Sequence, residues 1–268
     1  IDILSGEVEL ITRRLISETA LTDLVFGVDG GNDREVVLKA DLFREMEKVF
    51  TEYTYVESIC FYNSDNLSLI ADKEQNILIN DKDSRGRFYE EQIAGKGNGA
   101  GNGVKWYGGY INSDFNIKAL KDESRKEVYY VSACRPVYWG AHTAWLVINI
   151  NLDYFTDIYN SLEKENIQLS TTYIIDENGK VVSHLDKSEV GKRRENQYIR
   201  NKNDGPFTFE EGDQQILCYP LHLNGWTMVN ETPLSVILKD IKDIQIVFRI
   251  AVIAVAVFSV FFTIFLVR

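Results

Sequence analysis

The stretch Cys134-Arg-Pro-Val137, followed by Trp145-Leu-Val-Ile-Asn149, occurs a second time in altered form. The second copy reads Cys218-Tyr-Pro-Leu221 and then Trp226-Thr-Met-Val-Asn230. In both copies two strand-like runs lie close together and a helical pattern follows them. The same order of elements twice in one chain indicates two related structural units rather than a single irregular domain.

Each unit also begins with a similar hairpin pattern. Phe61-Tyr-Asn-Ser-Asp-Asn66 in the first unit corresponds to Ile174-Ile-Asp-Glu-Asn-Gly179 in the second, and both contain residues that favour tight turns. Strands in succession, with helices only at the ends, are typical of antiparallel α+β domains. We therefore predict an α+β fold with two antiparallel-sheet lobes in tandem, residues 32–163 and residues 164–232.

Periodicity predicts the elements within these lobes. Alternating patterns predict strands at 58–62, 67–70, 104–111, 128–138, 144–150, 171–175, 180–184, 207–210, 215–221 and 226–230. Helical spacing predicts helices at 33–53 and 152–163. Residues 84–93 fit a short helix or a loop. The glycine-rich run 95–103 lacks the Gly-Lys-Ser/Thr ending of a phosphate-binding loop, which favours a flexible loop.

The N-terminal segment, residues 1–31, is predicted to be a long helix that ends near the glycines at its C-terminal end. Its apolar residues alternate at spacings of three and four: Ile1, Leu4, Val8, Ile11 and Leu15. This spacing suits a helix packed on its own domain, and it equally suits a helix that pairs with a second copy of the chain. The sequence leaves both interpretations open.

The C-terminal segment begins with Thr232-Pro233, a pair that is typical of a helix start. Helical spacing continues through residues 233–249 into the run 250–267, which contains no charge, Pro or Gly. An uncharged apolar run of about 18 residues or more predicts a membrane-spanning helix. The alternative is a helix buried in a protein core. We expect residues 233–249 to form a stiff juxtamembrane helix and residues 250–267 to cross a membrane.

Composition excludes some functions. The formal net charge of −11 argues against nucleic acid as the main partner. Three cysteines, an odd number, allow either one disulfide with a free thiol or three buried thiols, and their apolar surroundings favour the second.

No catalytic or metal-binding constellation is evident. The three histidines, His142, His184 and His222, fit no metal-ligand spacing, and no nucleophile motif is present. A membrane-anchored enzyme is therefore the less favoured alternative, and we expect neither a metal nor a cofactor. The sequence indicates binding more clearly than catalysis.

Aromatic and polar residues near the glycine-rich run are candidates for a ligand site. The aromatic candidates are Phe88, Tyr89, Trp106 and Tyr110, accompanied by Tyr107. The polar groups that could orient a ligand are Arg87, Asn112 and Arg135. Binding pockets favour aromatic walls with a few polar groups, but aromatic residues also fill protein cores. Both interpretations of these aromatic residues remain open.

The complete order of elements, together with several short phrases, resembles the double Cache sensor domains, most closely those of Gram-positive YesM-like sensor histidine kinases. The supporting phrases are residues 135–138, 144–150, 223–229 and 232–234. The resemblance implies two PAS-like lobes, each with a twisted sheet of about five strands. It also implies a transmembrane helix before residue 1, a cytoplasmic HAMP and kinase region after residue 268, and an extracytoplasmic location for residues 1–249.

The same resemblance implies a functional unit. A small molecule, or a binding protein that carries it, would act at the membrane-distal lobe, 32–163. The receptor would form a homodimer through its N-terminal and transmembrane helices. Chemoreceptors use the same sensor module, so a chemoreceptor is an alternative, as is a membrane-anchored interaction module without a small ligand. Residues 164–232 would be the membrane-proximal lobe.

Amino-acid-binding members of this family carry an Arg-x-Trp-Tyr phrase and a following Asp. Here the corresponding phrase is Gly86-Arg87-Phe88-Tyr89, and Asn112 stands at the position of the Asp. Tyr89 matches, whereas the clamping Arg and Asp are both replaced. The standard mode of amino-acid recognition is therefore not expected.

Overall fold

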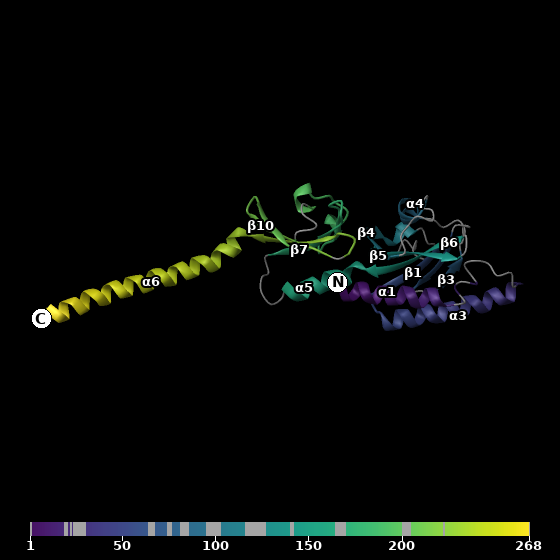
Figure 1. Ribbon diagram of the computed structural model, residues 1–268, viewed down its shortest axis with the longest axis horizontal. Coiled ribbons are helices and arrows are strands. Elements are labelled where there is room, and N and C mark those ends of the chain that lie inside the picture. The colour runs from purple at the N-terminus through teal and green to yellow at the C-terminus, as the bar shows by residue number, and fades with distance from the viewer. Residues whose placement is uncertain are drawn as a thin grey trace.

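The computed structural model shows an elongated molecule in which two antiparallel sheets lie side by side and a long helix leaves from one end (Figure 1). The structure describes residues 2–18, 21, 23, 31–63, 68–73, 77–80, 86–94, 103–115, 127–139, 142–163, 170–199, 205–221 and 223–267. Within these residues the predicted α+β class, with an N-terminal helix followed by two antiparallel lobes, is confirmed.

Runs of short strands are separated by a few helices. The helices are α1 (Asp2–Ser17), α3 (Gly31–Glu52), α4 (Arg87–Gln92), α5 (Leu152–Glu163) and α6 (Leu234–Val267), with short 3₁₀ turns η1 (Asn112–Phe115), η3 (Lys187–Glu189) and η4 (Asn196–Ile199). The distal strands are β1 (Val56–Asn63), β2 (Ser68–Asp72), β3 (Ile77–Asn80), β4 (Lys105–Ile111), β5 (Tyr129–Trp139) and β6 (His142–Asn151). The proximal strands are β7 (Thr171–Ile175), β8 (Val181–Ser183), β9 (Phe207–Glu211), β10 (Gln214–Pro220) and β11 (Thr227–Pro233).

The two sheets share one topology, which confirms the internal repeat. The distal sheet has the order β3-β2-β1-β6-β5-β4 and the proximal sheet the order β8-β7-β11-β10-β9. Apart from β3, each distal strand has a proximal counterpart at the same place. The repeated phrases fall on the corresponding pairs β5–β6 and β10–β11, where Cys134 pairs with Val147 and Cys218 with Val229. Strand β3 was missed by the sequence analysis.

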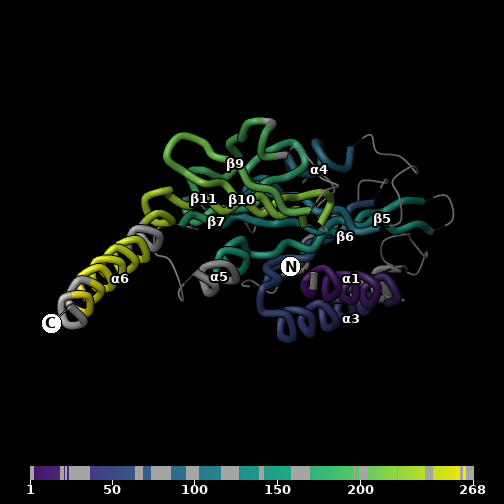
Figure 2. The backbone as a smooth tube through the Cα atoms, turned by 60° about the vertical axis from the view of Figure 1, so that its left-hand side comes forward, coloured from purple at the N-terminus to yellow at the C-terminus, as the bar shows by residue number. Residues whose placement is uncertain are grey.

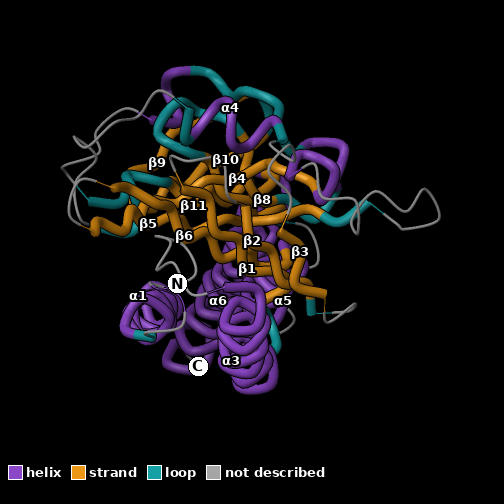
Figure 3. The backbone as a smooth tube through the Cα atoms, turned by 90° about the vertical axis from the view of Figure 1, so that its right-hand side faces the viewer, coloured by secondary structure: helices purple, strands orange, loops and turns teal. Residues whose placement is uncertain are grey.

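Helices α1 and α3 cover one face of the distal sheet, and α4 lies over the opposite face (Figure 3). Of the apolar residues predicted from the spacing of α1, Leu4, Val8, Ile11 and Leu15 are buried against the sheet, and Ile1 lies outside the described residues. Helix α1 ends at Ser17, so the helix is shorter than predicted over the described residues. Helix α3 contributes Leu42, Met46 and other apolar residues to the same core. The distal sheet is therefore buried on this side by helices.

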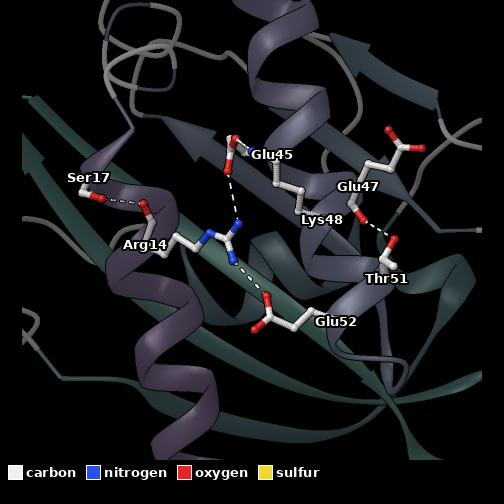
Figure 4. A network of polar contacts seen from close by, with 7 residues as sticks. All are labelled: Arg14, Ser17, Glu45, Glu47, Lys48, Thr51 and Glu52. Carbon is white, nitrogen blue, oxygen red and sulfur yellow. Dashed lines mark hydrogen bonds and ion pairs between the residues drawn. The ribbon is translucent and has the colours of Figure 1, made fainter.

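A polar network joins α1 to α3 at the surface of this layer (Figure 4). The guanidinium of Arg14 donates to Glu52 Oε2 at 3.0 Å and to Glu45 Oε2 at 3.3 Å. Glu45 also pairs with Lys48 one turn further along α3. Tyr55 adds a second tie, because its hydroxyl donates to Glu7 Oε2 at 2.7 Å. These contacts fix the position of α1 beside α3.

The two lobes share one continuous apolar core. Ile174, Val182 and Trp226 of the proximal lobe belong to the same buried cluster as the helix-facing side of the distal sheet. Edge strand β4 contacts β8 directly. The approach is so close that a Cβ placed on Gly108 would lie 2.3 Å from Val182 Cβ. The sequence predicted two lobes but not a core that runs through both.

Helix α6 continues directly from β11 and extends away from the sheets (Figure 2). The sequence predicted Pro233 at the first helical position. In the structure Pro233 is the last residue of β11, and the helix begins at Leu234. Many of its apolar side chains are exposed, among them Ile253, Val255 and Phe258.

No helix among the residues described here reaches the length and apolarity needed to cross a membrane. The membrane-spanning helix that the sequence predicted over 250–267 is therefore not found. The side chains at 260, 261 and 264–268 fall outside those that the structure describes.

Several local predictions are confirmed to within a residue or two. Helix α5 and strand β7 coincide with the predicted ranges, and α4 forms within 84–93. All three cysteines are free and buried, so the alternative of one disulfide is wrong. Of the glycine-rich run 95–103, residues 95–102 lie outside the described residues.

Candidate ligand site

A β-bulge in edge strand β4 organises the candidate site. The pairing with β5 is regular from Trp106 to Gly108 and then skips Gly109, so that Tyr110 pairs with Tyr130. Gly109 has a φ of +74°, a conformation that L-residues with a side chain rarely adopt. One inserted residue reverses the side of the sheet to which the following side chains point. The bulge therefore brings Tyr110 to the outer face, opposite to that of Trp106.

The outer face of the distal sheet carries an aromatic cluster beneath α4. Phe88 of α4 is fully buried and stacks on Phe115 with ring centroids 4.9 Å apart, and it meets Tyr110 edge-on at the same distance. Tyr89, also on α4, packs against Tyr62 of β1 with centroids 5.3 Å apart. These rings hold α4 on the sheet and form an apolar layer between them.

Tyr110 makes several polar contacts at the edge of this cluster. Its hydroxyl accepts a hydrogen bond from Gln92 Nε2 at 2.6 Å and donates to Glu91 Oε2 at 2.9 Å. Burial, and secondarily the hydrogen bond to Glu91, raises the pKa of Tyr110, although the bond from Gln92 acts in the opposite direction. Two cations, Arg87 and Lys180, each lie 5.4 Å from the centroid of its ring. The phenol therefore stays protonated and remains a donor.

The centre of the same face contains a buried polar chain with one unfilled donor. Ser132 Oγ donates to Asn149 Oδ1 at 2.7 Å, and Asn149 Nδ2 donates to Ser58 Oγ at 2.9 Å. Tyr62 is fully buried, and its hydroxyl has only the weakly polar Cys60 thiol beside it, without a hydrogen bond to an oxygen or nitrogen within the described part of the chain. Burial raises the pKa of Tyr62 well above its usual value. A buried hydroxyl without a partner costs about 1–3 kcal/mol, so this group marks the wall where a ligand would gain a hydrogen bond.

A cavity of about 440 Å³ opens beside the cluster, between the two lobes. Its distal wall comes from α4 and β4, and its proximal wall from the β7–β8 turn and the segment that follows β8. The side chains that line it are Glu91, Gln92, Trp106, Tyr107, Tyr110, Asp176, Glu177, Asn178, Lys180, Arg193 and Trp226. The volume is in the range of sites for small molecules.

The structure brings most of the predicted site residues together. Phe88, Tyr89 and Tyr110 form the aromatic layer, and Arg87 pairs with Asp114 Oδ2 at 2.7 Å at its rim. Asn112 is buried, and its Oδ1 accepts from the backbone N–H of Ser113 at 3.1 Å.

Two predicted residues lie elsewhere. Trp106 belongs to the core shared by both lobes and reaches the cavity at the sheet edge. Arg135 points to the helix side, where its Nη1 donates to Thr12 Oγ1 at 3.3 Å. Neighbours in a strand alternate between faces, so Arg135 is on the side opposite to Cys134 of the aromatic cluster. Its contact with α1 separates it from the other candidates.

The sequence did not indicate several residues of the aromatic layer beneath α4 and of the cavity between the lobes. Tyr62 lies in a strand that was predicted, but only the pairing of β1 with β6 shows which face it occupies. Lys180 and Arg193 come from the other lobe, about 70 residues or more from Tyr110 in the chain. The turn sequence at 176–179 indicated a hairpin and carried no signal for a site. Among the described residues, no group of His, Cys, Asp and Glu side chains could hold a metal ion.

Comparison with known proteins places this fold. The model of the Cache domain family matches residues 11–241, and the chain belongs to that family. No curated protein matches the chain.

Solved structures of similar fold are sensor domains. The extracellular domain described as that of a histidine kinase, vpHK1S-Z8, is 10% identical with a TM-score of 0.58, over 89% of this chain and 91% of that one. The periplasmic sensory domain of the Campylobacter jejuni chemoreceptor Tlp1 is 11% identical with a TM-score of 0.57, over 87% and 90%. The ligand-binding domain of the C. jejuni chemoreceptor Tlp3, in complex with L-norvaline, is 12% identical with a TM-score of 0.52, over 86% and 84%. At these identities the likeness shows the fold alone.

Proposed function

We propose that this chain is the extracytoplasmic sensor region of a membrane-bound sensor histidine kinase of the YesM-like type. The family membership, the fold shared with a domain described as extracellular in a histidine kinase, and the phrases at 135–138 and 223–229 support this proposal. The exposed apolar surface of α6 supports attachment to a membrane at the C-terminal end, because a soluble helix seldom exposes apolar side chains all round.

The ligand of this sensor is a small molecule that binds the distal lobe between α4 and the outer face of the sheet. One observation carries this step: the buried Tyr62 hydroxyl has no oxygen or nitrogen partner among the described groups, within a wall of aromatic rings. A ligand that enters here must displace part of α4, since Phe88 and Tyr62 are fully buried. Arg87, Tyr89, Tyr110 and Asn112 are the groups placed to contact it.

The signal leaves through β11 and α6. Strand β11 is the central strand of the proximal sheet, paired with β7 and β10, and α6 begins at the residue that follows it, without a linker. A shift of the proximal sheet is therefore transmitted to helix α6, which acts as a stiff rod. A ligand moves such an equilibrium only through its different affinities for the two states. Ile241→Pro, in the interior of α6, breaks the rod, and we expect it to leave ligand affinity unchanged and to abolish signalling in the full receptor.

A thermal-shift screen of the whole chain in detergent, against sugars, amino acids, organic acids and peptides, tests the binding step. A ligand at 100 times its Kd adds about 2.7 kcal/mol, which corresponds to a rise of about 5–10 °C for a domain of this size. Tyr62→Phe should remove most of that rise, whereas the matched change Tyr219→Phe, on the exposed side of β10, should not. A hit that Tyr62→Phe leaves unchanged would rule out the distal site.

A chemoreceptor is the second candidate, and the fold shared with the sensory domains of Tlp1 and Tlp3 favours it. The sequence beyond residue 268 separates the two candidates. A phosphoacceptor-histidine helix with an ATP-binding domain identifies a kinase, whereas a long coiled hairpin identifies a chemoreceptor. The third candidate is an interaction module without a small ligand, and the dense packing around Phe88 favours it.

The receptor acts as a homodimer in this proposal. Helix α1 leaves Ile3 79% exposed and Leu10 62% exposed, seven residues apart on its outer side. Two exposed apolar residues at this spacing form a seam along which a second copy of the helix can pack. Leu10→Glu should convert the dimer to a monomer in analytical ultracentrifugation, and an unchanged mass would exclude this seam.

A further inference from the structure

The cavity between the lobes is separate from the aromatic layer beneath α4. Tyr62 and Tyr89, which mark the distal site, do not line it, whereas Lys180 and Arg193 of the proximal lobe do. Tyr107 and Tyr110 of edge strand β4 have a part in both places, because each packs on Phe88 and also lines the cavity. The cavity therefore has walls from two lobes and its own set of polar groups.

The carboxylates that line this cavity already have partners. Asp176 Oδ1 accepts the backbone N–H groups of Asn178 and Lys180, at 2.8 and 2.9 Å. Glu91 accepts from the Tyr110 hydroxyl and pairs with Arg87 Nε at 3.8 Å. Glu177 also has an interaction partner. The negative charge of the lining is therefore engaged within the protein.

The two cationic side chains of the lining, Lys180 and Arg193, form no ion pairs within the described residues. The ammonium of Lys180 lies over the Tyr110 ring, 5.4 Å from its centroid, and forms no ion pair in the described structure. Arg193 contributes its backbone to a bridge with Lys180, and its side chain likewise forms no ion pair there. Two unpaired cations thus stand on the proximal side of the cavity. A cation that already faces a cavity requires little rearrangement to bind an anion.

Aromatic side chains form much of the remaining wall. Trp106, Tyr107 and Tyr110 face the cavity from β4, and Trp226 faces it from the proximal lobe. Burial raises the pKa of Tyr107 to about 12, so its hydroxyl stays protonated at neutral pH. The indole N–H of Trp226 has no acceptor among the described groups, which leaves an unfilled donor in the wall. The cavity combines flat apolar surfaces with hydrogen-bond donors and unpaired cations.

We propose that this cavity is a second ligand site, which binds a small organic carboxylate with a flat apolar body. Lys180 and Arg193 hold the carboxylate from the proximal side, and the rings of β4 pack against the apolar body from the distal side. Because its contacts come from both lobes, the ligand favours the arrangement in which β4 and β8 are docked. This site is independent of the distal site under α4.

Titration of the whole chain in detergent with aromatic carboxylates tests this proposal. The probes are benzoate, phenylacetate and indole-3-acetate, with benzylamine as the cation of matched shape, and binding is followed by calorimetry. Lys180→Met keeps the length of the side chain and removes its charge, and Lys180→Arg restores the charge. The matched control is Lys192→Met, because Lys192 precedes Arg193 on the segment that follows β8, is not part of the cavity lining, and pairs with Glu189.

We expect at least one of the carboxylates to bind and benzylamine not to bind. Lys180→Met should weaken the binding by about tenfold or more, since a hydrogen bond to a charged group is lost. Lys180→Arg should largely restore it, and Lys192→Met and Tyr62→Phe should leave it unchanged. If Lys180→Met fails to fold, Arg193→Met serves in its place. Binding of benzylamine instead of the carboxylates, no binding at millimolar concentrations, or loss of binding in Tyr62→Phe overturns the proposal.

Discussion

The two sheets share a topology and differ in how they meet solvent. In the distal sheet nearly every residue of β1 and β6 is buried, because helices cover one face and α4 with its aromatic layer covers the other. In the proximal sheet β7 and β8 are buried as well, whereas β9 and β10 carry exposed positions, and Leu217 and Tyr219 on β10 are 41% and 48% exposed. The same fold therefore forms a sheet with both faces covered in the distal lobe and a partly exposed sheet in the proximal lobe.

In our proposal, this difference gives the two lobes separate functions. A sheet with two covered faces can hold a ligand away from water, and its cover can move. The partly exposed proximal sheet has no such closed compartment around β10, but its last strand connects directly to α6. We therefore propose recognition by the distal lobe and transmission by the proximal lobe, and the core that both lobes share joins the two.

The largest effect is expected from truncating one buried side chain of the distal sheet and one exposed side chain of the proximal sheet. Ile70 of β2 is 1% exposed and Leu217 of β10 is 41% exposed. Ile70→Ala should lower the free energy of unfolding by about 3 kcal/mol, whereas Leu217→Ala should change it by less than about 0.5 kcal/mol. Urea unfolding measures both. Equal losses would mean that the proximal face is covered in solution and that the comparison fails.

The next effect concerns the contact between the lobes. Gly108→Ala places a methyl group against Val182, and we expect it to lower the free energy of unfolding by about 2 kcal/mol through overpacking. Gly103→Ala is the control, because nothing lies within 4 Å of its added Cβ. Chemical denaturation provides the measurement. If both variants are as stable as the parent chain, the lobes are not held together at this contact.

A smaller effect should appear at alkaline pH. Burial raises the pKa of Cys60 in the distal lobe, and of Cys218 in the proximal lobe, from 9.0 to about 12. Below about pH 9 both thiols are protonated in the folded and unfolded states, so their contribution to stability is complete. Between pH 9 and 12 the unfolded chain loses these protons first, and the free energy of unfolding falls as pH rises.

The size of this alkaline loss can be measured with single variants. For the fully buried Cys60 the loss is about 1 kcal/mol at pH 10, and Cys218 acts in the same direction. Cys60→Ala and Cys218→Ala should each flatten the dependence of stability on pH, as followed by denaturant unfolding from pH 7 to 11. A curve that neither variant flattens would show that the thiols are not shielded as described.

The smallest effect is expected at the surface network between α1 and α3. Arg14→Gln should cost less than about 1 kcal/mol, because the charges are partly solvated, and the cost should shrink at high salt. Arg13→Gln is the control, since Arg13 pairs with Glu9 on its own helix. Unfolding curves at low and high salt distinguish them. A loss of several kcal/mol would make this network, rather than apolar packing, the main tie of α1.

The sequence by itself determined the order of elements and their repetition. The phrases at 134–149 and 218–230 placed the paired long strands of both sheets, and α5 and β7 coincide with the predicted ranges. These features follow from local rules, since the alternation of apolar residues reports burial within a single strand or helix. The aromatic candidates Phe88, Tyr89 and Tyr110 were found for the same reason, because they cluster within a short length of chain.

Only the tertiary structure decided which side each residue faces and what lies opposite to it. The bulge at Gly109 turns Tyr110 away from the face of Trp106, and the pairing of β5 directs Arg135 to α1. The cavity between the lobes depends on Lys180 and Arg193, which are distant in sequence from the strand that they face. Side-chain periodicity predicts that successive residues of a strand point to opposite faces of the sheet. It does not show which residues of the neighbouring strand lie beside them or which face is covered. Both, like the contacts between lobes, are decided only when the sheets pair and pack.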